Sequence, residues 1–258
     1  MKNSIYLMAI FFLFLSCSND EDLQPMELRV PSVMNVFCQQ SPDVSIRKVE
    51  YKYNNDNLMT ETTLHNGDIY SQTSYTYNSD NHMTFEIYQT DGLKLEKTFI
   101  YNKSGQLVNI KYKTTYYDPD GQVVNESETE APREYKNGQL IKEWESWGGF
   151  NTYEYKEGNV AMKIDHSKLG EKHHVTSYKY SGRLLLEERT ENKDGDLIYR
   201  KIYQYDAQNR LVVVREGENV IEENEYVGNQ LIKKRTYYFG IDPGYDICYG
   251  NYIYHYQY

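Results

Sequence analysis

One short phrase recurs along the chain, and it constrains the fold more than any other feature of the sequence. In its full form it has two tyrosines one position apart, a polar turn and then an aliphatic residue, as in YQYDAQNRL at 203–211. Eight versions occur, at 51–58, 75–83, 99–107, 133–140, 153–160, 178–184, 203–211 and 224–231. Self-similarity at a period of roughly 20–50 residues indicates a repeat architecture.

Each phrase predicts a β-hairpin. Both tyrosines of Y-x-Y lie on one face of a strand, and Asn137-Gly138 is a strong two-residue turn signal because both positions favour positive φ. In longer loops, Gly105 and Asn209 are expected to be left-handed. The second tyrosine then faces an aliphatic residue, which contributes about 0.2–1 kcal/mol per pair. The expected pairs are Tyr53–Leu58, Tyr77–Met83, Tyr101–Leu107, Tyr135–Leu140, Tyr155–Val160, Tyr180–Leu184, Tyr205–Leu211 and Tyr226–Leu231.

A second set of turns, including Asn66-Gly67 and Asp194-Gly195, connects each hairpin to the next. No sustained helical periodicity follows Cys17. The chain is therefore predicted to be all-β, an antiparallel up-and-down meander of about 16–17 strands. Because long open sheets tend to curl or close, we expect either a wide soluble β-barrel or an open curled sheet.

Two cysteines flank the repeats. Cys38 precedes the first phrase and Cys248 precedes the last predicted strand. A disulfide between them would join the two ends of the meander, and the chain-entropy model assigns such a long loop about 5 kcal/mol. The alternative is a pair of free, buried thiols.

The N-terminus predicts export and lipidation. Residues 1–16 carry one early lysine and a short apolar run, as in a signal peptide. The junction F-L-S-C resembles a bacterial lipobox, with Cys17 as the lipidated residue; the alternative is an ordinary secretory peptide. We expect residues 17–26 to form an acidic tether and residues 27–258 a single repeat domain.

The acidic run after Cys17 resembles the surface-export signal of Bacteroidota lipoproteins. This resemblance favours an outer-membrane lipoprotein displayed on the cell surface; the periplasmic side is the alternative.

The charge pattern excludes several kinds of partner. The net charge is −10, which argues against nucleic acid and against electrostatic binding to anionic lipid. The segments 140–147, 184–191 and 231–236 carry charge on both strand faces. Lipid-facing strands need one apolar face, so we expect membrane contact through the lipid anchor only.

The phrases YQYDAQNRL, YNKSGQL and YKYSGRL resemble the YD repeat of RHS proteins, which build a β-strip that coils into a shell. The chain is too short for such a shell, and Asn209 replaces the glycine of the repeat. It more closely resembles Bacteroidota surface lipoproteins of unknown function with degenerate YD-like repeats. That resemblance implies a porin-like β-barrel and transfers no catalytic residue.

The sequence contains no catalytic, phosphate-binding or metal-binding motif, and we predict no metal, no cofactor and no enzyme activity. Trp144, Trp147 and Phe150 form a candidate platform for a sugar or a protein, although strand parity separates the two tryptophans; ordinary sheet packing is the alternative. A non-catalytic binding or scaffold protein is the favoured function. A glycan-binding accessory of a polysaccharide-uptake system and an enzyme with a cryptic site are the alternatives.

Overall fold

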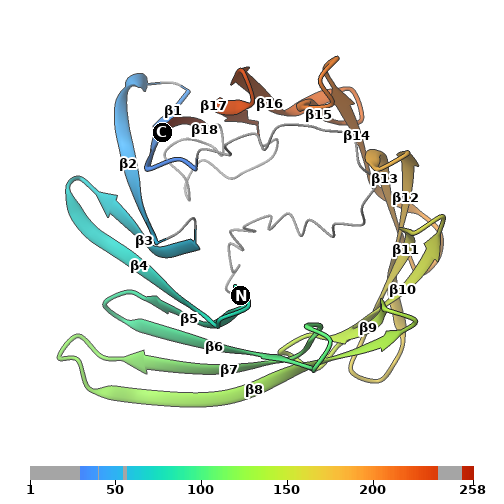
Figure 1. The fold of residues 1–258 in the computed structure, drawn as a ribbon, viewed down its shortest axis with the longest axis horizontal. Coiled ribbons are helices and arrows are strands. Elements are labelled where there is room, and N and C mark those ends of the chain that lie inside the picture. Colours follow the sequence, from blue (N-terminus) through green and yellow to red (C-terminus); the bar gives the residue numbers. More distant parts are fainter. Residues whose placement is uncertain (1–29, 40, 55–56, 238–251) are drawn as a thin grey trace.

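The chain folds into a closed, antiparallel β-barrel (Figure 1). The structure is a computed structural model, and it describes residues 30–39, 41–54, 57–237 and 252–258. Within these residues all regular structure is β-strand. Consecutive strands pair from β1 to β18, and β1 also pairs with β18, so the sheet has no free edge. Closure removes the exposed edges that a long open meander would present.

The strands are β1 (Val33–Cys38), β2 (Ser41–Asn54), β3 (Asn57–His65), β4 (Asp68–Tyr77), β5 (Met83–Gln89), β6 (Leu93–Tyr101), β7 (Leu107–Tyr117), β8 (Val123–Lys136), β9 (Gln139–Trp144), β10 (Phe150–Lys156), β11 (Asn159–His166), β12 (Lys172–Ser181), β13 (Leu184–Asn192), β14 (Leu197–Tyr205), β15 (Leu211–Glu216), β16 (Asn219–Val227), β17 (Gln230–Thr236) and β18 (Tyr252–Gln257).

The described strands number 18, one or two more than the sequence predicts. The additional strand is β1, which precedes the first tyrosine phrase and carries none of its signals. It lies between β18 and β2, pairing Val36 with Tyr254 on one side and with Arg47 on the other. This strand decides between the two predicted architectures, because it closes the meander into a barrel.

The tyrosine phrases form the eight predicted hairpins, and their turns gather at one end of the barrel, here named the tyrosine rim. Asn137 and Gly138 have φ of 51° and 81°, as a two-residue hairpin turn requires, and Gly105 and Asn209 are left-handed at 76° and 61°. A register shift directly precedes the second tyrosine in every hairpin. A repeated β-bulge bends each strand pair, and this curvature favours closure.

The register places every second tyrosine opposite an aliphatic residue, with one change from the predicted partners. Tyr180 faces Leu185, and the predicted partner Leu184 pairs instead with Ser181. The reason is the two-residue turn at Gly182-Arg183, which makes Ser181 and Leu184 the first pair of that hairpin and moves the tyrosine partner one residue further. The other seven pairs have the predicted register.

Five of these tyrosines also link their hairpin to the one before it, and Tyr53 and the C-terminal Tyr258 make equivalent bonds. Seven phenol hydroxyls donate a hydrogen bond to a main-chain carbonyl of an earlier strand or segment, at 2.7–3.0 Å. The bonds run from Tyr53 to Pro31, Tyr101 to Met83, Tyr135 to Leu107, Tyr155 to Leu140, Tyr205 to Leu185, Tyr226 to Leu211 and Tyr258 to Leu231. The phrase therefore stabilises its own hairpin through the ring and the adjacent hairpin through the hydroxyl.

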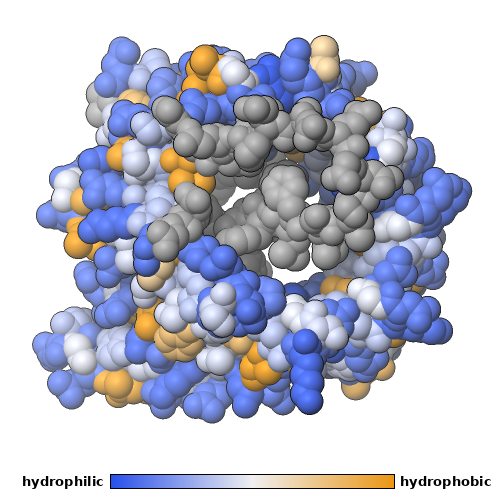
Figure 2. Space-filling view, viewed as in Figure 1, coloured by the Kyte–Doolittle hydropathy of each residue, from blue (hydrophilic) through white to orange (hydrophobic). Residues whose placement is uncertain are grey.

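The barrel wall is one sheet thick and has little apolar core. Among the described residues, the buried apolar side chains are Val36, Cys38, Val49, Ile110, Ala131, Val214 and Ile253. The view of Figure 2 is predominantly hydrophilic, with apolar residues in scattered patches. No helix in the described part of the chain is long and apolar enough to cross a bilayer.

Candidate functional site

The two faces of the barrel wall differ in chemistry. The register pairs Tyr51 of β2 with Glu61 of β3, so both side chains lie on one face. Burial is the main cause of the raised pKa of Tyr51, and Glu61, Tyr256 of β18 and Tyr75 of β4 raise it further. Strands β18 and β4 each lie two strands from β2. Side chains two strands apart approach one another on the concave face of a closed wall, so the tyrosines line the lumen.

The outer face carries exposed ion pairs at the alternate positions. Lys48 and Glu50, which flank the tyrosine positions of β2, form a pair at 2.6 Å with side chains 46% and 38% exposed. Lys113 and Glu126 form an equivalent pair across β7 and β8 at 2.9 Å. The alternation follows from the period of two in a strand, and it gives this barrel a charged exterior and a tyrosine-rich interior.

A band of lumenal residues, here named the lumenal ring, passes around the wall at the level of the first tyrosine of each phrase. It contains that position in all eight hairpins, together with its cross-strand partner. The pairs are Tyr51–Glu61, Tyr75–Glu86, Phe99–Ile110, Arg133–Glu143, Tyr153–Lys163, Tyr178–Glu188, Tyr203–Val214 and Asn224–Lys234. Three of the first tyrosines thus face a glutamate.

A lumenal hollow of about 560 Å³ lies on strands β11 to β14 and is here named the tyrosine pocket. Its size falls within the range of small-molecule sites. It is lined by Lys163, Asp165, His174, Thr176, Tyr178, Glu188, Thr190, Ile198, Tyr199, Lys201 and Tyr203.

Glu188 organises the tyrosine pocket. Its carboxylate accepts hydrogen bonds from the hydroxyls of Tyr199 at 2.6 Å and Tyr203 at 2.8 Å. Burial, with the bond to Glu188 next, raises the pKa of Tyr199 to about 12. Burial and Glu188 also raise the pKa of Tyr203. Both phenols are therefore neutral at physiological pH and act as hydrogen-bond donors.

The rest of the tyrosine pocket offers further polar groups and an aromatic face. The hydroxyls of Thr176 and Thr190 share a hydrogen bond of 2.9 Å in the wall. Lys201 Nζ lies 4.8 Å from the centre of the Tyr199 ring, within cation–π range. Hydroxyls, a carboxylate, an ammonium group and ring faces together suit recognition of a polar organic molecule.

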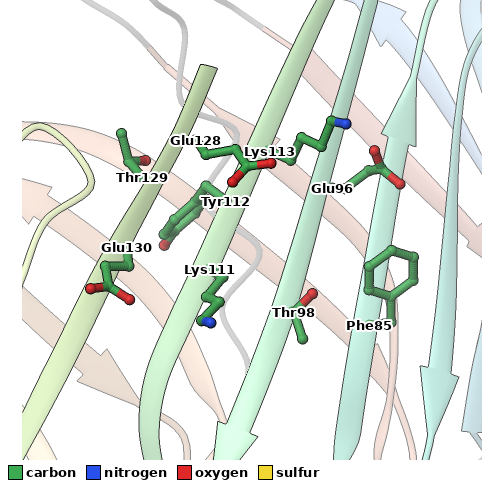
Figure 3. A pocket seen from close by; sticks show the side chains of 9 residues that line it. All are labelled: Phe85, Glu96, Thr98, Lys111, Tyr112, Lys113, Glu128, Thr129 and Glu130. Atoms are coloured by element: carbon green, nitrogen blue, oxygen red, sulfur yellow. The ribbon is translucent and has the colours of Figure 1, made fainter. Parts of the chain in front are cut away.

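A second hollow, of about 600 Å³, lies over strands β5 to β8 (Figure 3). Its lining includes Glu96, Lys111, Lys113, Glu128 and Glu130, which belong to the outward-facing set. Lys111, Glu128 and Glu130 are exposed. Charged groups in open water are strongly solvated, so we take the tyrosine pocket as the candidate site.

The two tryptophans do not form a joint platform. Trp144 pairs with Phe150, their ring centres 6.2 Å apart, and Phe150 stacks on His166 at 4.5 Å. Lys142 Nζ lies 4.1 Å from the centre of the Trp144 ring and 4.0 Å from that of Phe150. Since the adjacent Glu143 belongs to the lumenal ring, this aromatic row lies on the outer face.

Trp147 lies in the turn between β9 and β10 and is half exposed. Its ring covers Gly149 so closely that a Cβ atom at that glycine would overlap it. The contact explains why position 149 is glycine, whereas Gly148 has a φ of 94°, in the left-handed region that favours glycine.

Several sequence-predicted positions are only partly covered by the structure. Cys38 is disulfide-bonded, whereas its predicted partner Cys248 and the predicted lipidation residue Cys17 lie outside the described residues. The predicted signal peptide and the whole predicted tether lie outside them as well. In the described part of the chain, no group of three or more His, Cys, Asp or Glu side chains could hold a metal ion.

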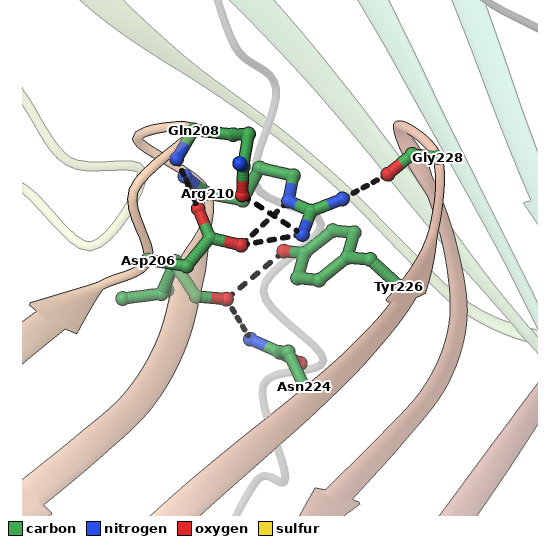
Figure 4. Close-up of polar contacts among 7 residues, drawn as sticks. Asp206, Gln208, Arg210, Asn224, Tyr226 and Gly228 are labelled. Atoms are coloured by element: carbon green, nitrogen blue, oxygen red, sulfur yellow. Dashed lines mark hydrogen bonds and ion pairs between the residues drawn. The ribbon is translucent and has the colours of Figure 1, made fainter.

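The turn of the YQYDAQNRL phrase shows how the tyrosine rim is built (Figure 4). Asp206 accepts main-chain hydrogen bonds from Gln208 and Arg210, and it also accepts one from the Arg210 side chain at 2.6 Å. Arg210 in turn donates to the carbonyl of Gly228 and lies 4.9 Å from the ring centre of Tyr226. The aspartate and arginine of this phrase thus join two adjacent turns, which is a structural role.

Sequence reasoning identified the tyrosines but missed the carboxylates of the lumenal ring. Glu61, Glu86 and Glu188 each follow the first tyrosine of a phrase by ten or eleven residues. This spacing could have predicted their position, because a hairpin of this length places the glutamate directly across the strand pair from the first tyrosine.

Comparison with known proteins gives a limited result. No family model and no curated protein sequence matches this chain. Among solved structures it is similar to a porin-like protein from Bacteroides uniformis ATCC 8492, with 17% identity over 59% of this chain and 57% of the other, at a TM-score of 0.40. It is also similar to the TcdB2-TccC3-Cdc42 structure, with 11% identity over 73% of this chain and 14% of the other, at a TM-score of 0.25. The chain thus spans just over half of the porin-like protein and a small part of the other.

Proposed function

We propose that this protein is a non-catalytic binding protein of the cell surface, tethered to the outer membrane by lipid on Cys17. The observation that supports a binding role most strongly is the tyrosine pocket. There, Tyr199 and Tyr203 are held in place by Glu188 at 2.6 and 2.8 Å. Tyrosine offers a large amphipathic contact area at a low entropic cost, which suits recognition. A scaffold role through the same barrel remains within this proposal.

The protonation chemistry of the pocket supports binding over catalysis. A general base must be free to take a proton near neutral pH. The Glu188 carboxylate instead accepts two phenol hydrogen bonds, and the pKa of Tyr199, raised to about 12, keeps its proton in place. Glu188, Tyr199 and Tyr203 are therefore suited to hold a ligand and poorly suited to transfer its protons.

The outer wall supports a barrel that is tethered to a membrane and not inserted in it. A charged side chain facing lipid at the bilayer centre costs about 2–4 kcal/mol in a transmembrane barrel. Exposed pairs such as Lys48–Glu50 and Lys113–Glu126 stand on the outer face of this one. The predicted signal peptide and lipobox provide the membrane attachment in this proposal.

Our second, more specific proposal is that the ligand is a glycan. The protein would then be a glycan-binding accessory of a polysaccharide-uptake system. Sugars present hydroxyls together with apolar ring faces, and the tyrosine pocket combines hydroxyl, carboxylate and ammonium groups with tyrosine rings. Its volume of about 560 Å³ suits a short oligosaccharide.

The binding proposal is tested with the mature chain on a glycan array and, in parallel, by thermal shift against a library of polar metabolites. We expect at least one ligand whose binding is weakened by Tyr203→Ala and by Glu188→Gln. Tyr70→Ala is the matched control, because Tyr70 is 56% exposed in the β3–β4 hairpin at the opposite rim. Binding that survives both pocket variants, or no ligand from either screen, would contradict the proposal.

The location is tested separately on intact cells. Protease added outside should degrade the protein, whereas Cys17→Ala should leave it unlipidated and released from the membrane fraction. Protection from protease until the outer membrane is permeabilised would place the protein on the periplasmic side.

A further inference from the structure

Glu61 differs from most other carboxylates of the lumenal face. Five of those have a partner within hydrogen-bond or ion-pair distance, whereas Glu61 makes no such contact among the residues that the structure describes. The partnered groups are Glu86 with Lys97 at 2.6 Å, Glu143 with Arg133 at 3.1 Å, Asp165 with Lys163 at 3.0 Å, Glu222 with Lys234 at 2.7 Å, and Glu188 with its two tyrosines.

Three tyrosines surround Glu61. Tyr51 is its direct cross-strand partner on β2, and the charge of Glu61 is the largest electrostatic contribution to the raised pKa of Tyr51, Tyr53 and Tyr75, after the larger effect of burial. The carboxylate therefore lies close to all three phenols. Thr73 faces it from β4, and the nearest other carboxylate is Glu86 of β5.

Tyr51 and Tyr53 donate their hydroxyl protons to groups other than Glu61. Tyr51 donates to the sulfur of Met34 at 3.8 Å, and Tyr53 donates to the carbonyl of Pro31 at 3.0 Å. This arrangement contrasts with Glu188, whose charge is neutralised by two phenol donors. The register thus places Glu61 between Tyr51 on one side and Thr73 on the other, with Tyr75 two residues further along β4, and no cation among the described residues pairs with it.

A carboxylate in this setting is costly unless something positive joins it. Burial raises the pKa of Glu61, and Glu86 raises it further. An unpaired, partly desolvated charge loses solvation without recovering it in contacts. Aromatic faces attract cations through the ring quadrupole, and rings around an acid are the usual surroundings of a bound ammonium group. A lone carboxylate lacks the several oxygen ligands that a divalent metal needs.

We propose that Glu61, with the rings of Tyr51 and Tyr75, binds the ammonium head of an organic cation inside the barrel. This inference rests on the proposed lumenal binding function and adds a ligand class to it. The ammonium group contacts the carboxylate and the two ring faces, while the remainder of the ligand extends along the lumenal ring.

The test is titration calorimetry of the whole mature chain with choline chloride and with its neutral isostere 3,3-dimethylbutan-1-ol. We expect saturable binding of choline and at least about tenfold weaker binding of the isostere, because only choline carries the charge. Glu61→Gln should weaken choline binding by at least about tenfold. Glu50→Gln is the matched control. It is the same change of side chain beside Tyr51 but on the outer face, and it should leave the affinity within about twofold.

The pH dependence of choline affinity shows whether Glu61 acts through its charge or through its shape. Choline affinity should fall as the pH is lowered and Glu61 becomes protonated, and Glu61→Gln should abolish that dependence. One charged group faces Glu61, namely Glu86, which is paired with Lys97. The other titratable groups nearby are the phenols of Tyr51, Tyr53 and Tyr75, which are neutral at these pH values. The melting temperature of Glu61→Gln should not fall, which shows that lost binding is not lost folding.

Two results would overturn the ammonium site. One is equal binding of choline and its neutral isostere, and the other is unchanged choline binding by Glu61→Gln. If instead a glycan binds in the tyrosine pocket while choline does not bind at all, the ammonium site is wrong and the broader binding function stands. If choline binds as expected and the pocket variants affect no ligand, the ammonium site stands and the tyrosine pocket is not a binding site.

Discussion

Removing one phenol hydroxyl tests whether the tyrosines hold adjacent hairpins together. The change is Tyr205→Phe, which keeps the ring opposite Leu211 and deletes the hydrogen bond from the hydroxyl to the carbonyl of Leu185 at 2.9 Å. A net hydrogen bond contributes about 0.5–1.5 kcal/mol to stability. Because Tyr205 is only half-buried, water can partly replace the bond, and we expect a loss of about 1 kcal/mol.

The assay is urea denaturation of the mature chain, with the midpoint and slope measured together. A loss of about 1 kcal/mol corresponds to a melting temperature about 2–4 °C lower for a domain of this size. Tyr70→Phe is the control, since Tyr70 is 56% exposed and makes no hydrogen bond among the described residues. The double variant Tyr101→Phe/Tyr205→Phe, on β6 and β14, should lose the sum of the two single effects because distant sites add.

One outcome would refute this account of the tyrosine phrase. If Tyr205→Phe and Tyr70→Phe had the same stability as the unmodified protein, the hydroxyls would be incidental, and the ring–aliphatic pairs alone would explain the repeated tyrosine.

Three further predictions concern charge and backbone. Arg200 and Lys179 hold the pKa of Glu187 below its usual value, so Glu187→Gln should cost less than about 1 kcal/mol at neutral pH, and this cost should disappear as the pH falls through the lowered pKa, measured by urea midpoints across pH. The pKa of Tyr199, raised to about 12, means that the folded state keeps this proton after the unfolded chain has lost it; stability should therefore fall as pH rises above about 10, with a late phenolate absorbance step. Gly105→Ala should cost about 1–2 kcal/mol, because φ is 76° and the new Cβ would lie 2.9 Å from His82 Cε1.

Local features of the barrel could be predicted because they depend on neighbours in sequence. The turn at Asn137-Gly138 requires two residues that tolerate positive φ, and the parity of a strand then determines which residue faces Tyr135. The same reasoning failed at Tyr180, because the two-residue turn at Gly182-Arg183 pairs Ser181 with Leu184 and the partner of Tyr180 is Leu185. Parity also separated Trp144 from Trp147, and the structure pairs Trp144 with Phe150 on the outer face.

The sequence alone determined the hairpin repeat, the all-β class and the alternation of tyrosine with charge along each strand, because these follow from periods of a few residues. Only the tertiary structure decided that the sheet closes, since closure depends on β1 meeting β18, more than 200 residues away. Closure in turn selects which strand face becomes concave. That choice places Glu61 among three tyrosines without a partner and gives Glu188 two, a difference that similar hairpin phrases do not reveal.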